Sequence, residues 1–274
     1  RMSRGCPWNR CTFCAITMHQ EGYRALPVPE VEPDLLAAHR TLRSTFFRFR
    51  DDLLTPKQLQ SLSQVMRRLP FSARFSVRSR FEPDLTREVL AEAQQAGLEE
   101  IWLGLESASP RVRSLMQKGV EQDVVERILD DAGALGLRVR ALCLLGFPGE
   151  TPAELRHTID FLDQHQMQLA SAALTPFLLM RRSPLGQDPQ SAGVQILPDK
   201  RPRHERLNAV LSATWPGAPS KDQLAALLDE ASARLGERFL DMSYGPSLAH
   251  ALIHHSVRRR GWPKVATTLP IVID

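Results

Sequence analysis

The sequence predicts an α/β protein whose strands form a parallel sheet. Five short segments have strand-like composition, rich in aromatic, β-branched or other apolar residues: 45–50, 71–78, 101–106, 139–145 and 169–175. Longer amphipathic segments lie between them, and the connections are short. This alternation of strands and helices is typical of βαβ units. Right-handed crossovers would let such a sheet curl toward a barrel, although the pattern alone also allows an open, doubly wound sheet.

The first unit follows an irregular, proline-containing stretch. Leu35, Leu36 and Leu42 recur at helical spacing and predict a helix over 33–43. The strand at 45–50 then leads to Thr55-Pro56-Lys57-Gln58. This tetrad has the N-cap residue, the N1 proline and the reciprocal glutamine of a capping box. A helix that ends near residue 69, just before a proline, is therefore expected.

The later units repeat the same design. Helices are expected over 84–96 and 120–135, and each is followed by a glycine, the residue most frequent just past a helix end. The segment 139–145 is apolar throughout, which is typical of a parallel strand buried on both faces. A second capping box, Thr151-Pro152-Ala153-Glu154, opens the last helix before the final strand.

The composition changes at Arg181, where a proline-rich boundary begins. This change divides the chain into an α/β domain, 1–180, and a mostly helical C-terminal region, 181–274. Within the second region we expect three helices and one short apolar strand, at 203–214, 222–236, 246–260 and 269–273.

Composition and charge limit the function classes. The 274 residues are 43% hydrophobic and 24% charged, with a formal net charge of +4. No apolar run reaches about 18 residues, so no membrane span is expected. No signal peptide precedes the cysteines and they form no even framework, so a reducing, cytoplasmic location is expected. The mild positive charge permits an anionic substrate, and no aromatic and basic stretch indicates nucleic acid binding.

Three of the four cysteines lie close to the first residue. Cys6, Cys11 and Cys14 have the spacing C-x4-C-x2-C, which lets one loop bring three thiolates to a metal centre. A closed zinc or iron–sulfur site takes four protein ligands, so three thiolates leave one metal position open. A zinc knuckle and a disulfide-bonded loop are the alternatives. The fourth cysteine, Cys143, lies in an apolar strand and is expected to be a small buried hydrophobe.

The loop resembles the cluster loop of radical S-adenosylmethionine (SAM) enzymes, with Gly5-Cys6-Pro7 at its start and Thr12-Phe13-Cys14 at its end. The resemblance implies a 4Fe–4S cluster on the three cysteines, with its fourth iron chelated by the amino and carboxylate groups of SAM. Reduction would cleave SAM to a 5′-deoxyadenosyl radical. The first cysteine gap is one residue longer than the family's commonest spacing. The resemblance also implies a partial (βα)6 TIM-like barrel, with the cluster-loop strand as the sixth strand.

Two strand ends resemble the family's SAM contacts. Gly104-Leu105-Glu106-Ser107 is similar to a Gly-x-Glu-Ser motif, which implies that Glu106, with Ser107 beside it, binds the SAM ribose or amino group. The alternative for Glu106 is a helix cap. Arg80, and less strongly Arg78, end the third strand, where a guanidinium would match the methionyl carboxylate. A surface ion pair with Glu82 or Asp84 is the alternative for Arg80.

A further turn resembles a family motif. Gly146-Phe147-Pro148-Gly149-Glu150 is similar to a Gly-x-Pro-Gly-Glu turn, which implies that Gly146, Phe147 and Pro148 contact the adenine. Trp8 and Phe13 flank the cysteines and are expected to shield the cluster. Lys118 also lies in a family-like segment, and a solvated helix end is its alternative. Asp51 and Asp52 could contact SAM or substrate, or cap a helix.

The order of these motifs over 4–180 identifies the chain as a member of the radical SAM enzymes. It is most similar to the branch that often carries an upstream cobalamin-binding domain, and most of the first barrel strand is expected to be missing. The resemblance implies radical modification of an unreactive carbon, by methylation, rearrangement or a similar reaction. Its cofactors would be a 4Fe–4S cluster, SAM and, through the missing domain, cobalamin.

The expected partners are a small-molecule or peptide substrate and a reductant such as flavodoxin or ferredoxin. Two other hypotheses stay open, a tRNA-modifying radical SAM enzyme and a non-catalytic iron–sulfur or electron-transfer protein.

Overall fold

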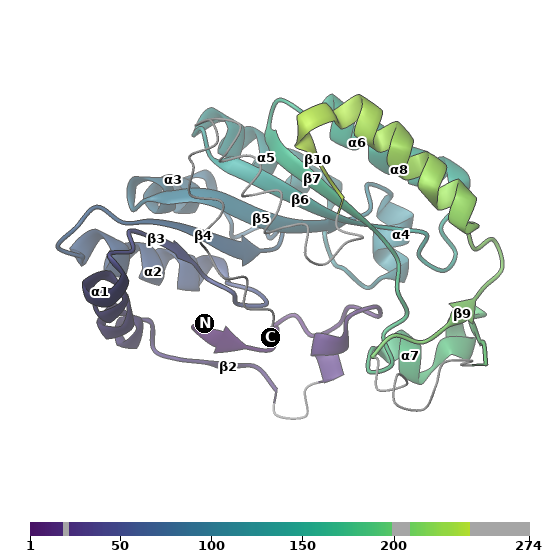
Figure 1. The fold of residues 1–274 in the computed structure, drawn as a ribbon, viewed down its shortest axis with the longest axis horizontal. Helices are drawn as coiled ribbons and strands as arrows, with labels where there is room; N and C mark the ends of the chain where they lie inside the picture. Colours follow the sequence, from purple (N-terminus) through teal and green to yellow (C-terminus); the bar gives the residue numbers. More distant parts are fainter. Residues whose placement is uncertain (19–21, 199–208, 242–274) are drawn as a thin grey trace, which may run out of the picture.

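The computed structural model describes residues 1–18, 22–198 and 209–241. Its centre is a six-stranded sheet in which every neighbouring pair is parallel, in the order β10-β7-β6-β5-β4-β3 (Figure 1). The strands are β3 (Phe46–Arg48), β4 (Arg74–Ser79), β5 (Leu98–Glu106), β6 (Arg138–Leu145), β7 (Leu169–Pro176) and β10 (Phe239–Asp241). The first five are the predicted strands, which are confirmed.

The order of the strands decides between the two predicted architectures. From β3 to β7 each strand lies beside the next one in the chain. A doubly wound sheet instead reverses its order at a switch point. The continuous order therefore confirms the α/β class and agrees with a partial barrel.

The sixth strand differs from the prediction. The strand before the cysteine loop, β1 (Ser3–Arg4), pairs antiparallel with β2 (Arg24–Ala25) in a separate two-stranded sheet. The position beside β7 is taken by β10, which follows α8 and pairs parallel with β7, so that one more strand–helix–strand unit extends the sheet. The cluster-loop strand was expected to be the sixth strand of the main sheet. This prediction was wrong, because the backbone of β1 forms its hydrogen bonds with β2.

The predicted helices are confirmed with small shifts in their ends. They are α1 (Val31–Leu42), α2 (Pro56–Arg68), α3 (Arg87–Gln95), α5 (Gln122–Ala134), α6 (Pro152–Gln164) and α8 (Lys221–Leu235). Both predicted capping boxes form, with Thr55 and Thr151 each accepting from the backbone three residues ahead. The short helix α4 (Pro110–Leu115) begins at Pro110, near which the alternative role of Glu106 as a helix cap placed a helix. Other short elements were not predicted: α7 (Pro184–Gln187), η1 (Ala15–Met18), η2 (Val28–Glu30), η3 (Pro189–Ala192), η5 (Gly236–Arg238), β8 (Gln195–Ile196) and β9 (Ala213–Thr214).

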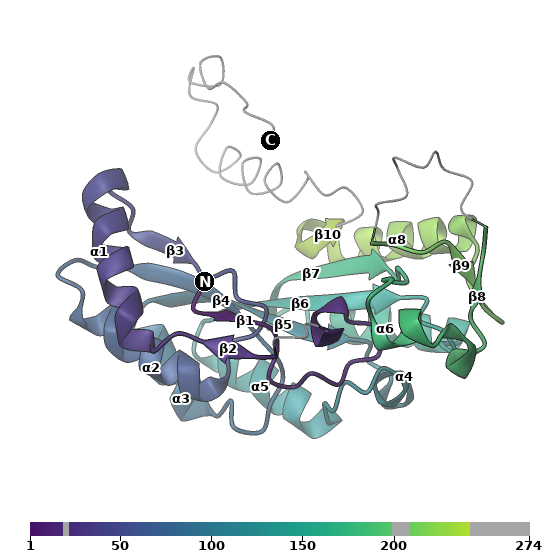
Figure 2. The ribbon, with the colours of Figure 1, turned by 90° about the horizontal axis from the view of Figure 1, so that it is seen from below.

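The two faces of the sheet have different chemistry. Successive side chains of a strand point to opposite faces. On β5, Ile101, Leu103 and Leu105 are buried in the main hydrophobic core with residues of α2, α3, α5 and α6. The alternate positions carry Glu100, Trp102, Gly104 and Glu106. Seen from below in Figure 2, β1, β2 and η1 lie in front of the strands. Because helices pack against the first face, the second, more polar face is the one left for a site.

The C-terminal region contributes to the same body. Helix α8 packs on α6, where Arg234 pairs with Asp160 at 2.6 Å and Asp163 at 2.8 Å. The predicted helix at 203–214 is wrong for its described part, because Val210 bridges to Met180 and β9 follows. The predicted elements at 246–260 and 269–273 lie outside the described residues, and the division at residue 180 stays a prediction.

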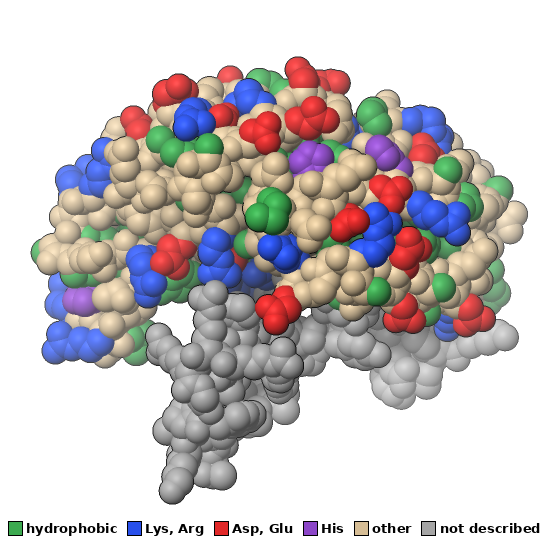
Figure 3. Space-filling view, turned by 90° about the horizontal axis from the view of Figure 1, so that it is seen from above, with side chains coloured by type: hydrophobic (Ala, Val, Ile, Leu, Met, Phe, Trp, Pro, Cys, Tyr) green, Lys and Arg blue, Asp and Glu red, His purple; other side chains and the backbone are tan. Residues whose placement is uncertain are grey.

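The outer surface is mixed in charge. Figure 3 shows acidic and basic side chains interspersed over the face where α6 and α8 lie. Among the described residues, no helix combines the length and the apolar character needed to span a membrane.

Candidate functional site

The cysteine loop is fastened to the segment that follows β5. The Thr12 amide donates to the Met116 carbonyl at 3.0 Å, and the Thr12 carbonyl accepts from the Leu185 amide at 2.9 Å. The Cys14 amide donates to the Cys11 carbonyl at 3.2 Å, which closes the turn between these two cysteines. The loop therefore lies at the C-terminal end of the sheet, where parallel α/β proteins bind their ligands.

Trp8 provides a second anchor between the loop and the sheet. Its indole nitrogen donates to the Gln117 carbonyl at 3.0 Å, and the Arg80 guanidinium lies 3.9 Å from its ring centroid. A side chain at residue 119 would collide with this ring, because a Cβ on Gly119 would lie 2.2 Å from two of its atoms. Trp8 was predicted to shield a cluster, and in the structure it joins the loop to Arg80.

A buried ion pair lies beside the loop. Glu106 ends β5 and accepts from the Lys118 ammonium at 2.6 Å, and the two residues are 9% and 7% exposed. Glu106 has a positive φ of 65°, a conformation that costs free energy and is concentrated at functional sites. A side chain at residue 104 would displace this pair, since a Cβ there would lie 2.5 Å from the Glu106 carboxylate and 2.7 Å from the Lys118 ammonium. Lys118 is thus no solvated helix end.

The cysteines share this environment as thiols, since none of the four forms a disulfide. Cys11 interacts electrostatically with Lys118, Glu106, Cys14 and Arg80. Burial raises the pKa of the Cys11 thiol to about 11, although Lys118 opposes the shift. Among the described residues no three His, Cys, Asp or Glu side chains are grouped to hold a single metal ion. A 4Fe–4S cluster makes a different demand, because each thiolate binds a different iron atom.

Arg80 has donors to spare. Its Nη2 donates to the carbonyls of Lys118 at 2.5 Å and Gly119 at 2.8 Å, and its Nε lies 3.5 Å from Glu82. Its Nη1 is buried and has no hydrogen-bond partner within the described structure. Burial lowers the pKa of Arg80, and the nearby Glu82, Cys11 and Cys6 oppose that shift. A buried guanidinium with an unused donor fits a bound carboxylate, so the donor set here is compatible with SAM. The predicted ion pair with Glu82 is also present.

Asp51 holds the start of the cysteine loop. It is fully buried, and one carboxylate oxygen accepts from the Met2 amide and the Ser3 hydroxyl, both at 2.8 Å, and from the Ser3 amide. These bonds tie β1 to the end of β3. Its carboxylate therefore positions Met2 and Ser3, just ahead of the cysteine loop, rather than capping a helix.

The Gly146–Glu150 turn is organised by its last residue. One Glu150 carboxylate oxygen accepts from the amides of Gly146 at 2.8 Å and Phe147 at 3.1 Å. The other accepts from the hydroxyl of Ser107 at 3.2 Å. Ser107 is fully buried, so it links the end of β5 to this turn rather than opening toward a ligand. Burial raises the pKa of Glu150 to about 7, although its hydrogen bonds oppose the shift.

The raised pKa makes a testable prediction for stability. The folded state binds the Glu150 proton more tightly than the unfolded state, whose pKa is near 4.5, so the free energy of unfolding falls as pH rises from about 4.5 to 7. Glu150→Gln should flatten this slope in urea unfolding measured across that window. The matched control is Glu154→Gln. Hydrogen bonds from Arg111 lower the Glu154 pKa to about 2, so that carboxylate has the opposite dependence, losing its contribution as pH falls. An unchanged slope in Glu150→Gln would contradict the prediction.

The predicted site residues thus fall into three groups. Cys11, Arg80, Glu106 and Phe13 surround Lys118, whose ammonium lies 5.9 Å from the Phe13 ring. Cys6 and Cys14 belong to this first group, because Cys6 interacts electrostatically with Arg80 and Cys14 with Cys11. Gly146, Phe147, Pro148 and Ser107 form the adjoining turn, and Phe13 packs against the small hydrophobic cluster that contains Phe147. Arg78 is elsewhere, stacked on Trp102 at 5.2 Å from the ring centroid.

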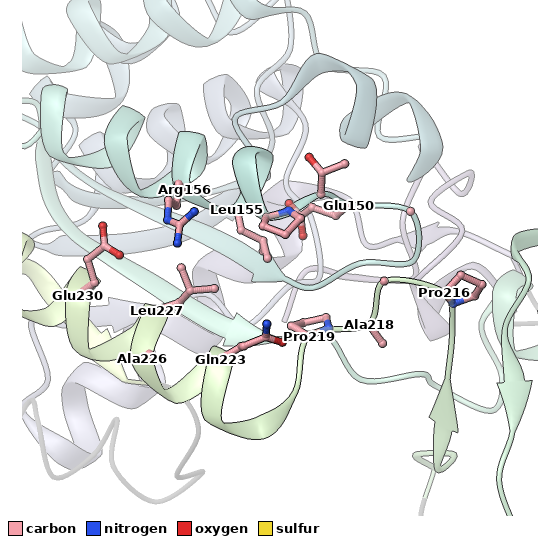
Figure 4. Close-up of a pocket in the computed structure, with 14 residues that line it drawn as sticks. Glu150, Leu155, Arg156, Pro216, Ala218, Pro219, Gln223, Ala226, Leu227 and Glu230 are labelled. Atoms are coloured by element: carbon pink, nitrogen blue, oxygen red, sulfur yellow. The ribbon is translucent and has the colours of Figure 1, made fainter.

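A cavity of about 540 Å³ lies apart from the cysteines, between α6, α8 and the 216–219 turn. In Figure 4, Leu155 and Leu227 face one another across it, and Glu150 lies at the end nearest the turn. None of the cysteines lines it. It therefore adjoins the Gly146–Glu150 turn without reaching the cysteine loop.

Sequence reasoning named two further residues without finding the roles that the structure gives them. Glu150 was quoted as part of a turn, but its carboxylate organises that turn. Asp51 has a buried role in holding the N-terminal strand. A carboxylate directly after a glycine-containing turn was a signal for the first. No local signal existed for the second, because its partners are 48 and 49 residues away.

Comparisons with known proteins agree with this geometry. The family model described as the Radical SAM superfamily matches residues 1–162. An uncharacterised methyltransferase of Pyrococcus horikoshii is 27% identical over 178 residues, covering 64% of this chain and 39% of the relative. The ribosomal protein uS12 methylthiotransferase RimO of Xanthomonas euvesicatoria is 36% identical over 105 residues, covering 36% of this chain and 20% of the relative. The chain therefore spans well under half of these relatives.

Solved structures show the same fold. The radical SAM methyltransferase TsrM of Kitasatospora setae, with cobalamin and a 4Fe–4S cluster bound, superimposes with a TM-score of 0.66 at 18% identity. The match covers 87% of this chain and 53% of that chain. The cobalamin-dependent radical SAM enzyme OxsB gives 0.61 at 16% identity, over 78% of this chain and 38% of that chain.

Proposed function

Because the chain belongs to the radical SAM superfamily, we propose that it binds a 4Fe–4S cluster through Cys6, Cys11 and Cys14 and cleaves SAM reductively. The observation that supports the proposal best is the meeting of the cysteine loop with Arg80 and the buried Glu106–Lys118 pair. A cluster bound there would supply the electron that splits SAM into methionine and a 5′-deoxyadenosyl radical. The protein's contribution is then to bind, orient and exclude water.

Each residue has a role that follows from its contacts. Arg80 would receive the methionyl carboxylate on its unused Nη1 donor. Glu106 would accept from the SAM amino group or ribose, with Lys118 holding its carboxylate in place. Phe13 and Phe147 would cover the nucleoside with apolar surface. Ser107 and Glu150 would act through the turn that they hold, which presents Gly146 and Pro148.

The reaction class that we propose is transfer of a methyl or methylthio group to an unreactive carbon, because relatives of the chain are described as methyltransferases and methylthiotransferases. Both solved relatives are described as cobalamin proteins, and cobalamin is therefore the second cofactor that we propose. The substrate would be a small molecule or peptide, and flavodoxin or ferredoxin would supply electrons in the cytoplasm.

The test is anaerobic iron–sulfur reconstitution of the chain, followed by dithionite and SAM, with 5′-deoxyadenosine measured by mass spectrometry. We expect about four iron atoms per chain and 5′-deoxyadenosine that requires both reductant and SAM. Omission of dithionite is the control. A cluster that forms without SAM cleavage would overturn the catalytic proposal in favour of electron transfer, and zinc in place of iron would overturn the cluster itself. Repeating the reaction with added cobalamin and methyl-labelled SAM tests the second cofactor.

A further inference from the structure

Three arginines surround one tryptophan on the polar face of the sheet. The guanidinium carbons of Arg140, Arg48 and Arg78 lie 4.2, 5.1 and 5.2 Å from the Trp102 ring centroid. They come from three different strands, β6, β3 and β4, and register pairs Trp102 with both Arg78 and Arg140. We call Arg48, Arg78, Arg140 and Trp102 the arginine cluster. These residues are far apart in the sequence, and the pairing of the strands in the sheet brings them together.

The positive charge of the arginine cluster exceeds the negative charge of the carboxylates that pair with it. Glu100 accepts from Arg140 at 3.2 Å and lies 3.9 Å from Arg48, and it is shared with the more exposed Arg138 at 3.5 Å. Within the described residues Arg78 makes no ion pair. Burial lowers the pKa of Arg78, and Arg50 and Arg48 lower it further, whereas Asp52 opposes them. Burial also lowers the pKa of Arg140, against the pull of Glu100.

Several buried donors around the cluster are unused. Arg140 is 4% exposed, yet its Nε and Nη1 have no hydrogen-bond partner in the described structure, and neither does the Nε of Arg48. The hydroxyls of Ser76 and Ser171 are also buried and unpartnered. Register places Ser76 opposite Arg48 and Ser171 opposite Arg140. A buried polar group without a partner costs free energy, so a ligand that accepts from these donors would be favoured.

A small hollow borders three members of the arginine cluster, Arg48, Arg78 and Trp102. It is lined by Arg48, Ser76, Arg78 and Trp102, among others, and has a volume of about 10 Å³. This is space for one water-sized group. An oxygen atom of an anion would fit there, and Arg48 and Arg78 are both only half-buried at its edge.

We propose that the arginine cluster is a subsite for an oxyanion, a carboxylate or phosphate, carried by the substrate. Guanidinium groups bind both oxyanions through paired hydrogen bonds, and a neutral or cationic group would leave the excess charge unmatched. The proposal rests on the proposed function, because it names the substrate class of that site. Trp102 precedes Glu106 by four residues on β5, which is roughly 13 Å of strand. The reacting carbon would lie between the two positions.

The test is calorimetric titration of the full chain with inorganic phosphate and, separately, with malonate, at constant ionic strength in chloride. We expect one site for at least one of the two anions, and which one binds tells phosphate from carboxylate. Arg78→Gln should weaken binding by about tenfold or more, the scale of a lost charged hydrogen bond. The matched control is Arg74→Gln on the same strand, an exposed arginine paired with Glu99 at 2.8 Å, which should bind as the wild type does.

A second variant guards against a folding defect in Arg78→Gln. Ser76→Ala removes a buried hydroxyl that has no partner in the described structure, so the fold should not weaken while anion binding does. No binding above chloride, or wild-type binding by both Arg78→Gln and Ser76→Ala, would overturn the subsite. The titration needs neither the iron–sulfur cluster nor SAM, and it is run before and after iron–sulfur reconstitution. Anion binding without SAM cleavage would therefore remove the proposed function alone, and the converse would remove the subsite alone.

Discussion

Replacing Cys11 by serine is expected to abolish both the iron–sulfur centre and SAM cleavage. Cys11 is the buried member of the three cysteines, and its carbonyl accepts from the Cys14 amide at 3.2 Å, so the loop itself should survive the change. Iron–sulfur clusters require soft thiolate ligands, and a serine oxygen is a hard one. The loss should exceed the roughly 10- to 100-fold that removal of an outer-shell partner costs. Iron content and 5′-deoxyadenosine are the measurements.

The matched control for this prediction is Cys143→Ala. Cys143 lies on β6 in the main hydrophobic core, and burial raises its pKa well above the ordinary value. It has no part in the cysteine loop, so the variant should keep its iron and its activity. Full iron and SAM cleavage in Cys11→Ser would contradict the assignment of this cysteine. Equal iron loss in both variants would show that iron content follows folding rather than ligation.

Replacing Lys118 by methionine is expected to destabilise the protein by about 3–5 kcal/mol, the cost of removing one partner of a buried ion pair. Methionine nearly keeps the volume but leaves the Glu106 carboxylate buried beside Gly104 without its cation. The free energy of unfolding is measured by urea denaturation followed by circular dichroism. SAM affinity, measured on the folded protein, should fall as well, because Lys118 orients the carboxylate that we assign to SAM.

Two further variants make this prediction specific. Arg68→Met breaks an exposed ion pair, with Glu32 at 3.2 Å, and should cost no more than about 1 kcal/mol. The double variant Glu106→Gln/Lys118→Met removes both charges and should recover part of the lost stability, which a double-mutant cycle quantifies. If Lys118→Met proves no more destabilising than Arg68→Met, the pair does not have the buried character that its geometry indicates.

Much of the fold could be predicted because its signals are local. A capping box occupies four consecutive residues, and both predicted boxes, at Thr55 and Thr151, form as expected. Strand and helix periodicity likewise extends over a few residues, so five strands and six helices were predicted in the correct order. The prediction failed for β1, which was expected in the main sheet but pairs with β2. A strand of two residues carries little local information about its partner. Short segments have weak local preferences, and tertiary pairing decides them.

The candidate site was predictable to the same extent. Cys6, Cys11 and Cys14, Glu106 and Arg80 lie in recognisable short motifs, and the structure brings Cys11, Arg80 and Glu106 into one environment. The sequence could not predict which of the motif residues turn their side chains toward the cysteine loop and which turn toward other partners. Ser107 follows Glu106 directly, yet its hydroxyl is fully buried against Glu150, and Arg78 stacks on Trp102 two residues before Arg80.

The sequence by itself determined the α/β class, the helix starts and the cysteine loop, because each depends on residues that are neighbours in the chain. The tertiary structure decided that Lys118 pairs with Glu106, that β10 completes the sheet, and that three arginines from separate strands meet at Trp102. Burial and strand register control these contacts. Both are properties of the whole sheet, since the environment of a charged side chain depends on everything packed around it.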